Sequence, residues 1–209
     1  MGENTIVAPL AAVASAIRDA VGVRLRSLPM SSPKVLAAIL ANRPTDGRAA
    51  SLRLVRADDT ERFIEYFAGL STRSRYFFHP FKFERTSAVD VTGDSDAPDT
   101  HRVVAVVERD GGESIVGYVW LTGIGGPEIP MLGIGIVDAY QEYGIGRRLL
   151  HALLDVGRKL GVSGIRLGVF DDNPRAIHVY ESVGFRVDTT KPIEERGPHK
   201  EVYMVCDLR

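Results

Sequence analysis

The feature that most constrains the fold is a strand, turn, helix and strand pattern between residues 131 and 170. Residues 131–137 are apolar, and residues 165–169 alternate large apolar with other side chains, so both segments are expected to be strands. A helix is expected at about 145–160, with apolar side chains on one face at spacings of three and four: Ile145, Leu149, Leu153, Val156 and Leu160. Strands joined by such a helix lie parallel with a right-handed crossover. The sequence therefore predicts a central β-α-β unit.

The turn that opens this helix has the sequence Gln141-Glu142-Tyr143-Gly144-Ile145-Gly146-Arg147-Arg148. The first N–H groups of a helix lack intrahelical partners, and with the helix dipole they attract anions. Glycines let a phosphate approach the main chain without a clash. Arginines in the first turn oppose the dipole unless a polyanion lies beside them. The turn predicts a pyrophosphate site, with a solvated glycine-rich turn as the alternative.

Two other phosphate motifs do not fit this turn. The P-loop string is absent from the sequence, and the dinucleotide fingerprint needs a third glycine where Leu149 stands.

The remaining elements predict an α/β (α+β) fold whose sheet is mixed and mostly antiparallel. A strand at about 52–54 precedes a helix at 60–69, which Asp58-Asp59-Thr60 should cap. The other expected segments are an aromatic helix at 72–83, a loop at 86–100, strands at 103–107 and 114–122, a helix at 174–183, and strands at 185–187 and 200–207.

The first part of the chain differs in texture from the rest. Residues 1–48 are alanine-rich with apolar patches at 10–21 and 33–41, and turn-forming residues 42–47 follow. We predict an N-terminal helical extension at 1–48 and a main domain at 49–209. The extension packs on its own domain, or it docks a partner or a second copy to form a homodimer. Because Glu3 and Pro9 do not suit a secretory signal, an export signal is the weaker interpretation.

Composition narrows the class of protein. The 209 residues are 44% apolar and 25% charged with a net charge of −1, as in an ordinary soluble domain. This balance gives no basis for electrostatic capture of nucleic acid or of a membrane surface. Cys206 is the single cysteine, and no cluster has metal-ligand spacing. We expect a cytoplasmic protein without a metal.

Two blocks of residues resemble the GNAT N-acetyltransferase superfamily. Gln141-x-x-Gly144-x-Gly146 is similar to the family's Q/R-x-x-G-x-G/A motif. The segment from Asn173 through Ala176 and Tyr180 to Gly184-Phe185 is similar to its N-x-x-A-x-x-x-Y-x-x-x-G-F segment. The blocks stand in the family's order, and the resemblance covers about 51–208. It implies an N-acyltransferase with acetyl-CoA as co-substrate.

The resemblance also implies roles for individual residues. The strands at 131–137 and 164–170 would splay apart, and pantetheine would enter the gap. Tyr180 would reach the sulfur of the leaving thiol. Acyl-CoA contacts are implied for the main chain of the first strand and its turn and for the start of the next helix: Ile136, Val137, Gln141, Tyr143, Gly144, Ile145, Gly146, Arg147, Arg148 and Asn173.

The sequence departs from the family pattern in three places. Glu142 and Tyr143 stand where glycine and a basic residue are frequent, and Met131 stands near the position of a frequent glutamate base. A non-catalytic acyl-CoA sensor or an interaction module on the same fold is therefore the alternative to an enzyme.

The chemistry expected is direct attack of a primary amine on the thioester in a ternary complex. Tyr180 is the candidate acid, because a phenol can protonate the departing thiolate. Glu128 is the favoured candidate base, and deprotonation through water without a dedicated base is an equal alternative. The other candidates are Asp138, His79, His101 and Glu108.

Two further expectations concern the nucleophile and the acceptor. Cys206 has no histidine near it in sequence, so a covalent acyl-enzyme is not expected.

The aromatic run 76–83 and the segment 189–200 are expected to border the acceptor cleft. The string Ser74-Arg75-Tyr76-Phe77-Phe78 also resembles a helix in GNAT domains of bacterial protein-lysine acetyltransferases, which favours a protein or a polyamine as acceptor, with a core helix that has one aromatic face as the equal alternative. The expected acceptor is therefore the amine of a small molecule, of a protein lysine or of an N-terminus.

Overall fold

The structure is a computed structural model that describes residues 50–209 except 79–81, 96 and 110. The predicted extension 1–48 lies outside the described residues, so its helices and its division from 49–209 stay predictions. Within the described part, no helix is both long enough and apolar enough to cross a bilayer.

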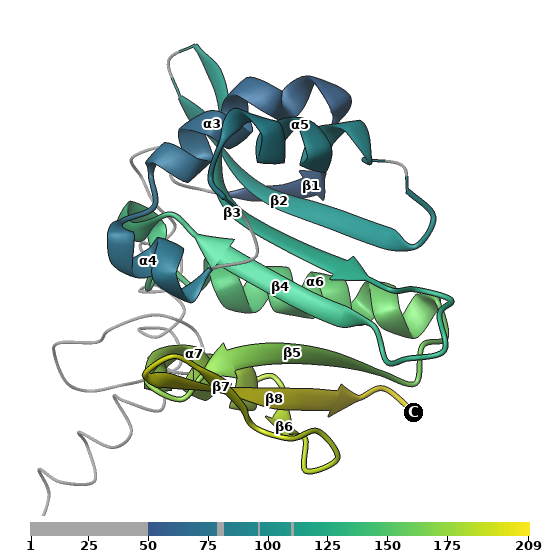
Figure 1. The fold of residues 1–209 in the computed structure, drawn as a ribbon. Helices are drawn as coiled ribbons and strands as arrows, with labels where there is room; N and C mark the ends of the chain where they lie inside the picture. Colours follow the sequence, from purple (N-terminus) through teal and green to yellow (C-terminus); the bar gives the residue numbers. More distant parts are fainter. Residues whose placement is uncertain (1–49, 79–81, 96, 110) are drawn as a thin grey trace, which may run out of the picture. The chain divides into compact units, whose positions relative to one another are not determined.

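The described residues form one mixed sheet with helices on both faces (Figure 1). The strands are β1 (Ser51–Leu54), β2 (Thr100–Arg109), β3 (Gly112–Thr122), β4 (Met131–Ile136), β5 (Gly164–Phe170), β6 (Arg186–Val187), β7 (Glu194–Arg196) and β8 (His199–Asp207). The helices are α3 (Thr60–Ala68), α4 (Thr72–Phe77), α5 (Arg85–Gly93), α6 (Ile145–Lys159) and α7 (Pro174–Glu181), with short 3-10 turns η1 (Ala57–Asp59) and η2 (Asp138–Tyr140).

The sheet has the strand order β1-β2-β3-β4-β5-β8-β6, and β7 pairs with β8. Strands β4 and β5 are parallel and are joined by α6, while the other neighbouring strands are antiparallel. The predicted mixed sheet with a central parallel β-α-β unit is therefore confirmed.

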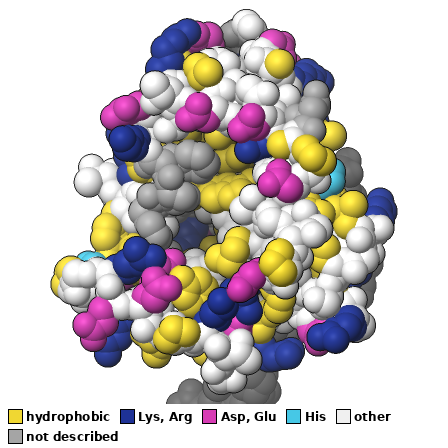
Figure 2. All heavy atoms as spheres, turned by 45° about the vertical axis from the view of Figure 1, so that its right-hand side comes forward, with side chains coloured by type: hydrophobic (Ala, Val, Ile, Leu, Met, Phe, Trp, Pro, Cys, Tyr) yellow, Lys and Arg dark blue, Asp and Glu magenta, His cyan; other side chains and the backbone are white. Residues whose placement is uncertain are grey.

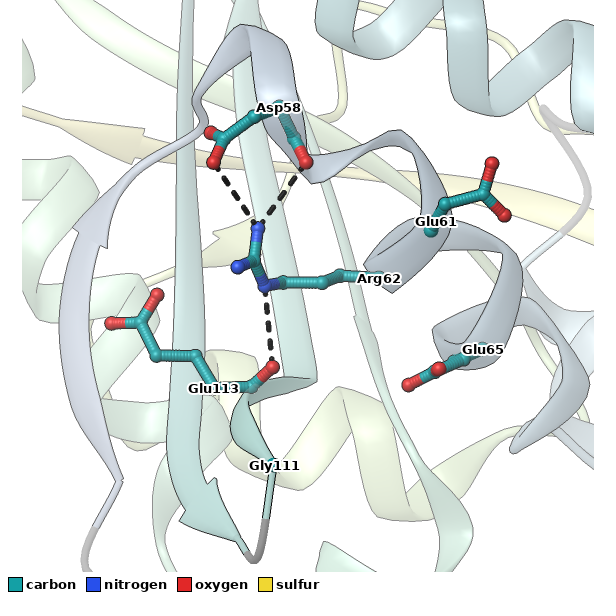
Figure 3. A pocket seen from close by; sticks show the side chains of 6 residues that line it. All are labelled: Asp58, Glu61, Arg62, Glu65, Gly111 and Glu113. Atoms are coloured by element: carbon teal, nitrogen blue, oxygen red, sulfur yellow. Dashed lines mark hydrogen bonds and ion pairs between the residues drawn. The ribbon is translucent and has the colours of Figure 1, made fainter.

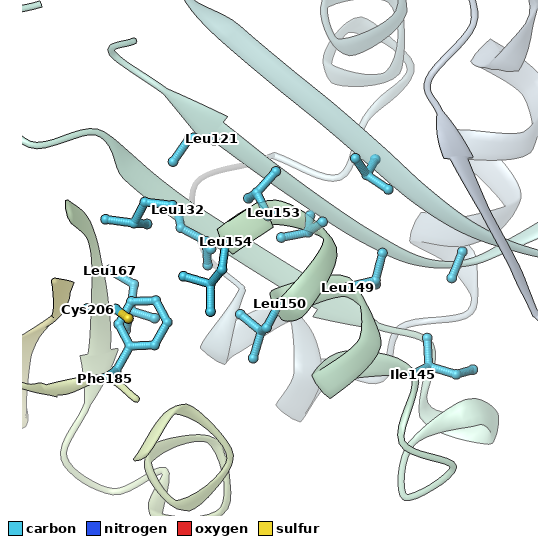
Figure 4. Close-up of a cluster of buried hydrophobic side chains, with 14 of the residues drawn as sticks. Leu121, Leu132, Ile145, Leu149, Leu150, Leu153, Leu154, Leu167, Phe185 and Cys206 are labelled. Carbon is cyan, nitrogen blue, oxygen red and sulfur yellow. The ribbon is translucent and has the colours of Figure 1, made fainter. Parts of the chain in front are cut away.

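Strand β2 shows why both faces of the sheet are covered. Val103, Ala105 and Val107 belong to the core on the α6 side, which Figure 4 shows in part, and Val104 and Val106 belong to a second core beneath α3, α4 and α5. Successive side chains of a strand point to opposite faces, so a continuous apolar run indicates a strand buried on both faces.

Helix α6 buries a wider face than its sequence spacing predicted. Ile145, Leu149 and Leu153 are buried as expected, whereas Leu160 is 45% exposed just beyond the end of the helix. Leu150 and Leu154 are also buried, because α6 packs across several strands at once.

Two expectations about the segment between α3 and β2 are wrong. The aromatic helix ends at Phe77, and the predicted loop at 86–100 contains α5. The sequence of α5 shows little amphipathic pattern, and three of its residues are buried: Ala88, Val91 and Thr92. Its packing against α3 stabilises a helix that local propensity does not specify. Strand β7 was also missed inside the segment 189–200.

On the face drawn in Figure 2, acidic and basic side chains are interspersed, and hydrophobic side chains gather around a hollow. This mixture agrees with the net charge of −1.

The start of α3 is held by a buried carboxylate. Asp59, expected as a helix cap, is fully buried and instead accepts hydrogen bonds from Arg53 Nη1 at 2.7 Å and Nη2 at 2.8 Å. The Arg56 N–H donates to it at 2.8 Å and Arg62 Nη1 at 3.1 Å. Burial raises the pKa of Asp59, but these donors and positive charges outweigh it and lower the pKa below its usual value.

We predict that Asp59→Asn lowers the free energy of unfolding at pH 7 by about 1–3 kcal/mol, because the Arg53 guanidinium loses its buried anion and keeps only Glu113, at 2.8 Å. A carboxyl whose pKa is lowered on folding stabilises the protein above its unfolded pKa of about 3.9 and loses that effect as the pH falls through the folded pKa. The difference between variant and wild type should therefore shrink below about pH 4.

Urea unfolding at pH 7 and pH 3 measures this difference. The control is Asp58→Asn, since the Asp58 side chain is 71% exposed and lies 3.6 Å from Arg62, and its loss should cost about 1 kcal/mol or less. Equal stability of the two variants at pH 7 would contradict the prediction.

Candidate active site

Strands β4 and β5 separate along their length. They pair only where Met131 lies opposite Arg166, and the Arg166 N–H donates to the Pro130 carbonyl at 2.9 Å. Beyond this point β4 continues against β3 to Ile136, and β5 continues against β8 to Phe170. The sheet is therefore open between the carboxyl ends of two parallel strands.

The edge of β4 presents main-chain groups to this gap. Residues of an antiparallel strand alternate in the direction of their N–H and C=O groups. The Val137 N–H donates to Val116 O at 2.9 Å, so odd-numbered residues of β4 face β3 and even-numbered residues face β5. Within the described residues, no ladder pairing occupies the N–H and C=O of Ile134 on the gap side.

The main-chain groups of Ile136 and Val137 are partly occupied by hydrogen bonds within the protein. The Ile136 carbonyl accepts a hydrogen bond from Gln141 Nε2 at 3.1 Å, and the Val137 N–H is bonded to β3. Of the main-chain groups of Ile136 and Val137, which were expected to meet pantetheine, the N–H of Ile136 faces the gap. Both main-chain groups of Ile134, which was not among the expected residues, also face it.

The turn from Gln141 to Gly146 follows β4 and η2 and opens α6. Glu142 has φ of 70° and Gly144 has φ of 75°, both in the left-handed region. Left-handed residues in a turn bring successive N–H groups to one side, which is the geometry of anion-binding concavities. Glycine adopts this conformation freely, whereas Glu142 is strained in it. Tyr143 is 46% exposed, and Arg148 is exposed while Arg147 is half-buried.

A hydrogen-bond network connects this turn with α4 and α7. Asp138 accepts from the Ser71 N–H at 2.9 Å and the Ser71 hydroxyl at 2.7 Å, and from the Ser74 hydroxyl at 3.0 Å. Gln141 Nε2 also donates to Ser74 Oγ at 3.1 Å, and Gln141 Oε1 accepts from Arg175 at 3.1 Å. Asp138 is thus a structural acceptor that starts α4, although sequence reasoning considered it as a base.

Helix α7 flanks the gap on the β5 side. Asn173 Oδ1 accepts from the Ala176 N–H at 3.3 Å and caps the helix. Tyr180 is partly exposed, its ring lies 6.1 Å from Phe185, and burial raises the pKa of its hydroxyl to about 12. A phenol with this pKa is protonated at neutral pH and can act as a hydrogen-bond donor or acid.

Glu128 is not brought to the open end of the gap. It precedes β4 at the end where β4 and β5 pair, 72% exposed, with Lys191 Nζ at 3.2 Å and Arg166 Nη1 at 3.6 Å. The turn 141–146 lies beyond the opposite end of β4. Glu128 is therefore engaged in ion pairs just outside the closed end of the gap, and its role as the base stays a prediction.

Two further candidate bases lie on a strand that does not border the gap. His101 and Glu108 lie on β2, which pairs with β1 and β3. His79 lies outside the described residues. Cys206 is buried, and burial raises the pKa of its thiol, which does not suit a nucleophile.

His199 was not singled out from the sequence, and it lies near the carboxyl end of β5. Tyr76 of α4 stacks on Phe170 at the end of β5 with ring centroids 5.2 Å apart, and it lies 4.8 Å from His199 of β8. His199 Nδ1 lies 3.1 Å from Asp172 Oδ2. The expected aromatic run and the segment 189–200 thus meet here, but no sequence spacing connects His199 with Tyr76, since only the sheet brings them together.

A separate pocket lies beside α3 and the start of β3, at residues that do not line the gap. Figure 3 shows Arg62 reaching Asp58 and the Glu113 carbonyl across it, with Glu61 and Glu65 at its side. Its side chains take part in the ion pairs that hold α3. Among the described residues, no group of histidine, cysteine or carboxylate side chains could hold a metal ion.

Comparison with known proteins agrees with this geometry. The model of the Acetyltransferase (GNAT) family matches residues 63–185, and the chain belongs to this family. N-alpha-acetyltransferase RimI of Mycobacterium tuberculosis is 43% identical over 93 residues, which are 43% of this chain and 54% of that protein. The [Ribosomal protein bS18]-alanine N-acetyltransferase of Escherichia coli is 39% identical over 64 residues, which are 31% of this chain and 43% of that protein. The matches thus span about half the length of these curated relatives.

Solved structures share the fold. The GNAT domain of S. lividans PAT superposes with a TM-score of 0.63 at 24% identity, covering 76% of this chain and 90% of that one. Spermidine N-acetyltransferase from Vibrio cholerae, solved in complex with CoA and spermine, superposes with a TM-score of 0.61 at 21% identity, covering 76% and 95%. The expected GNAT membership and fold are confirmed.

We predict that Asn173→Ala lowers the free energy of unfolding of the ligand-free protein by about 1 kcal/mol, because the first turn of α7 loses its cap. Thermal unfolding measures the change. Asn173→Asp keeps an acceptor oxygen and should unfold within a few tenths of a kcal/mol of wild type. If the two variants unfold together, the capping role is excluded.

Proposed function

We propose that this protein is an acetyl-CoA-dependent N-acetyltransferase that acts on a primary amine by direct attack in a ternary complex. The observation that carries the proposal is the gap between β4 and β5, which opens toward a turn with left-handed residues at the start of a helix. This arrangement offers a slot for an extended thioester arm and an anion site at its mouth.

The turn and the first residues of α6 bind the pyrophosphate in this proposal. The ligand residues are Tyr143, Gly144, Ile145, Gly146, Arg147 and Arg148, through main-chain N–H groups and the two guanidinium groups. Gln141 holds the turn in place, because its N–H donates to the Asp138 carbonyl at 3.2 Å and its side-chain amide donates to Ser74 and Ile136. The polyanion also offsets the unfavourable position of two arginines at a helix N-terminus. Pantetheine lies along the gap-side groups of Ile134 and Ile136. Asn173 shapes the gap through its cap of α7 and does not need to touch the ligand.

The transfer breaks the C–S bond of the thioester and forms a C–N bond to the amine. Tyr180 protonates the departing thiolate, since its hydroxyl carries its proton at neutral pH. The amine loses its proton to water. This route follows from β4, whose residues on the α3 side are Met131, Gly133 and Gly135 and include no carboxylate.

The acceptor is an amine of a protein or of a small molecule. RimI is named as an N-alpha-acetyltransferase, the Escherichia coli relative is named for an alanine of ribosomal protein bS18, and the Vibrio cholerae structure is named for spermidine. We also propose that residues 1–48 are an extension separate from the acyltransferase domain 49–209, because the family model begins at residue 63. A homodimer through this extension, a cytoplasmic location, and the lack of nucleic acid, membrane or metal partners remain proposals.

A non-catalytic acyl-CoA sensor is the second candidate. The absence of a carboxylate on β4 among Met131, Gly133 and Gly135 favours it. Turnover separates the candidates, since a sensor binds acetyl-CoA but transfers no acetyl group to any of a panel of amines.

Calorimetric titration with acetyl-CoA, with NAD and ATP as controls, tests the proposal. Micromolar binding of acetyl-CoA alone supports it. If neither acetyl-CoA nor longer acyl-CoAs bind, the strained Glu142 and exposed Tyr143 have disabled the turn and the proposal fails.

We predict that Gly144→Ala weakens acetyl-CoA binding at least tenfold, because an alanine does not readily keep φ of 75° and the turn must change shape. Gly125→Ala is a matched control: Gly125 has φ of 77°, and a Cβ at either glycine would meet no atom within 4 Å. Both variants should lose about 1–2 kcal/mol of stability, and only Gly144→Ala should lose affinity. Equal affinity of the two variants would rule out the turn as the binding site.

We predict that Tyr180→Phe lowers kcat by about 10²-fold while the Kd for acetyl-CoA stays within twofold of wild type, since the hydroxyl acts on the departing thiolate and not on binding. Steady-state kinetics and calorimetry on the same sample measure both values. Unchanged kcat would remove Tyr180 from the chemistry.

A further inference from the structure

Strand β4 carries glycine at two positions on the face covered by α3 and α4. A Cβ at Gly133 would collide with the indole ring of Trp120 on β3, at Cζ2, Cη2 and Cε2. A Cβ at Gly135 would collide with the Tyr66 hydroxyl and lie 3.0 Å from the Phe78 ring. The space of two β4 side chains is therefore occupied by aromatic rings from neighbouring elements.

These two glycines flank Ile134, the residue whose main-chain groups face the gap. The gap closes where Met131 pairs with Arg166, so a thioester held inside it lies beside residues 132–136 of β4. A thioester carbonyl bound by the gap-side main chain of Ile134 would carry its acyl group beside Gly133, against the Trp120 ring.

The Trp120 ring is half-buried and is held by two neighbouring aromatic rings. It stacks on Tyr118 with centroids 5.2 Å apart and an interplanar angle of 23°, and it meets Phe78 edge-on at 5.5 Å. Tyr118 and Phe78 are buried in the core beneath α3 and α4. Added methylenes in a packed interior are resisted, because neighbouring side chains leave their preferred rotamers.

The opposite face of β4 is also filled. Ile134 and Ile136 pack against the core that contains Ile145 and Leu149 of α6. An acyl chain beside Ile134 is thus bounded by aliphatic side chains on one face of the sheet and by Trp120 on the other.

We infer that Trp120, laid against Gly133, determines acyl specificity and restricts the bound acyl group to acetyl. This inference rests on the proposed acyl-CoA site and adds the residue that sets its chain length. A site that fits the acetyl methyl discriminates against each further methylene, typically by about 10–200-fold.

Calorimetric Kd values for CoA, acetyl-CoA and butyryl-CoA test the inference without knowledge of the acceptor. In wild type, butyryl-CoA, whose chain has two more methylenes, should bind at least about 100-fold more weakly than acetyl-CoA. In Trp120→Ala, the ratio of the two Kd values should fall to within about threefold of unity, because the cavity left by the indole accommodates the longer chain. A ratio within one variant cancels any general loss of affinity.

Phe67→Ala is the control for a cavity in the same core. Phe67 is buried among Phe63, Tyr66 and Phe83, and a Cβ at Gly133 or Gly135 would have no Phe67 atom among its nearest neighbours. Its ratio should equal that of wild type. The same ratio in Trp120→Ala as in wild type, or equal affinity of wild type for both acyl-CoAs, would overturn the inference. Failure of CoA itself to bind wild type would instead overturn the proposed function.

Discussion

The single point of pairing between β4 and β5 is the constraint on which the rest of the candidate site depends. A parallel pair that continued past Met131 and Arg166 would use the gap-side main-chain groups of Ile134 for the sheet. Because the strands part, β4 keeps its partner β3 and β5 keeps its partner β8, and the opening costs only a few ladder hydrogen bonds. Helix α6 spans the opening from behind with a continuous apolar face, so the two halves remain one core.

The two ends of the gap have different chemistry. At the closed end, Arg166 pairs with the buried Asp188 at 2.7 Å, and Glu128 lies at the surface of the same ion-pair group. At the open end, Gln141 and Asp138 tie the turn to α4 through Ser74, so elements on the two sides of the candidate site share hydrogen bonds. Glu128 and Asp138 both carry the charge that proton transfer needs, but their positions give them contacts with Arg166 and with Ser74. The position of a side chain along β4 decides what it can do.

Glycine has two different functions in this region. In the turn, Gly144 supplies a left-handed conformation, with φ of 75°. In β4, Gly133 and Gly135 have ordinary strand conformations and matter because they lack a Cβ, which lets Trp120, Tyr66 and Phe78 reach the strand. The first function is visible in a strand-to-helix turn of the sequence. The second depends on residues from β3, α3 and α4 and has no local signal.

The sequence by itself determined the β-α-β unit, the glycine-rich strand-to-helix turn and the family, because periodicity, turn chemistry and motif spacing are local properties of the chain. It also determined most strand positions, since the continuous apolar run of β2 permits few alternatives. Only the tertiary structure decided that Glu128 lies at the closed end, that Asp138 starts α4, that α5 is a helix and that His199 meets Tyr76. These facts arise from contacts between residues far apart in the chain, and packing outweighs the weak local preferences that would have predicted them.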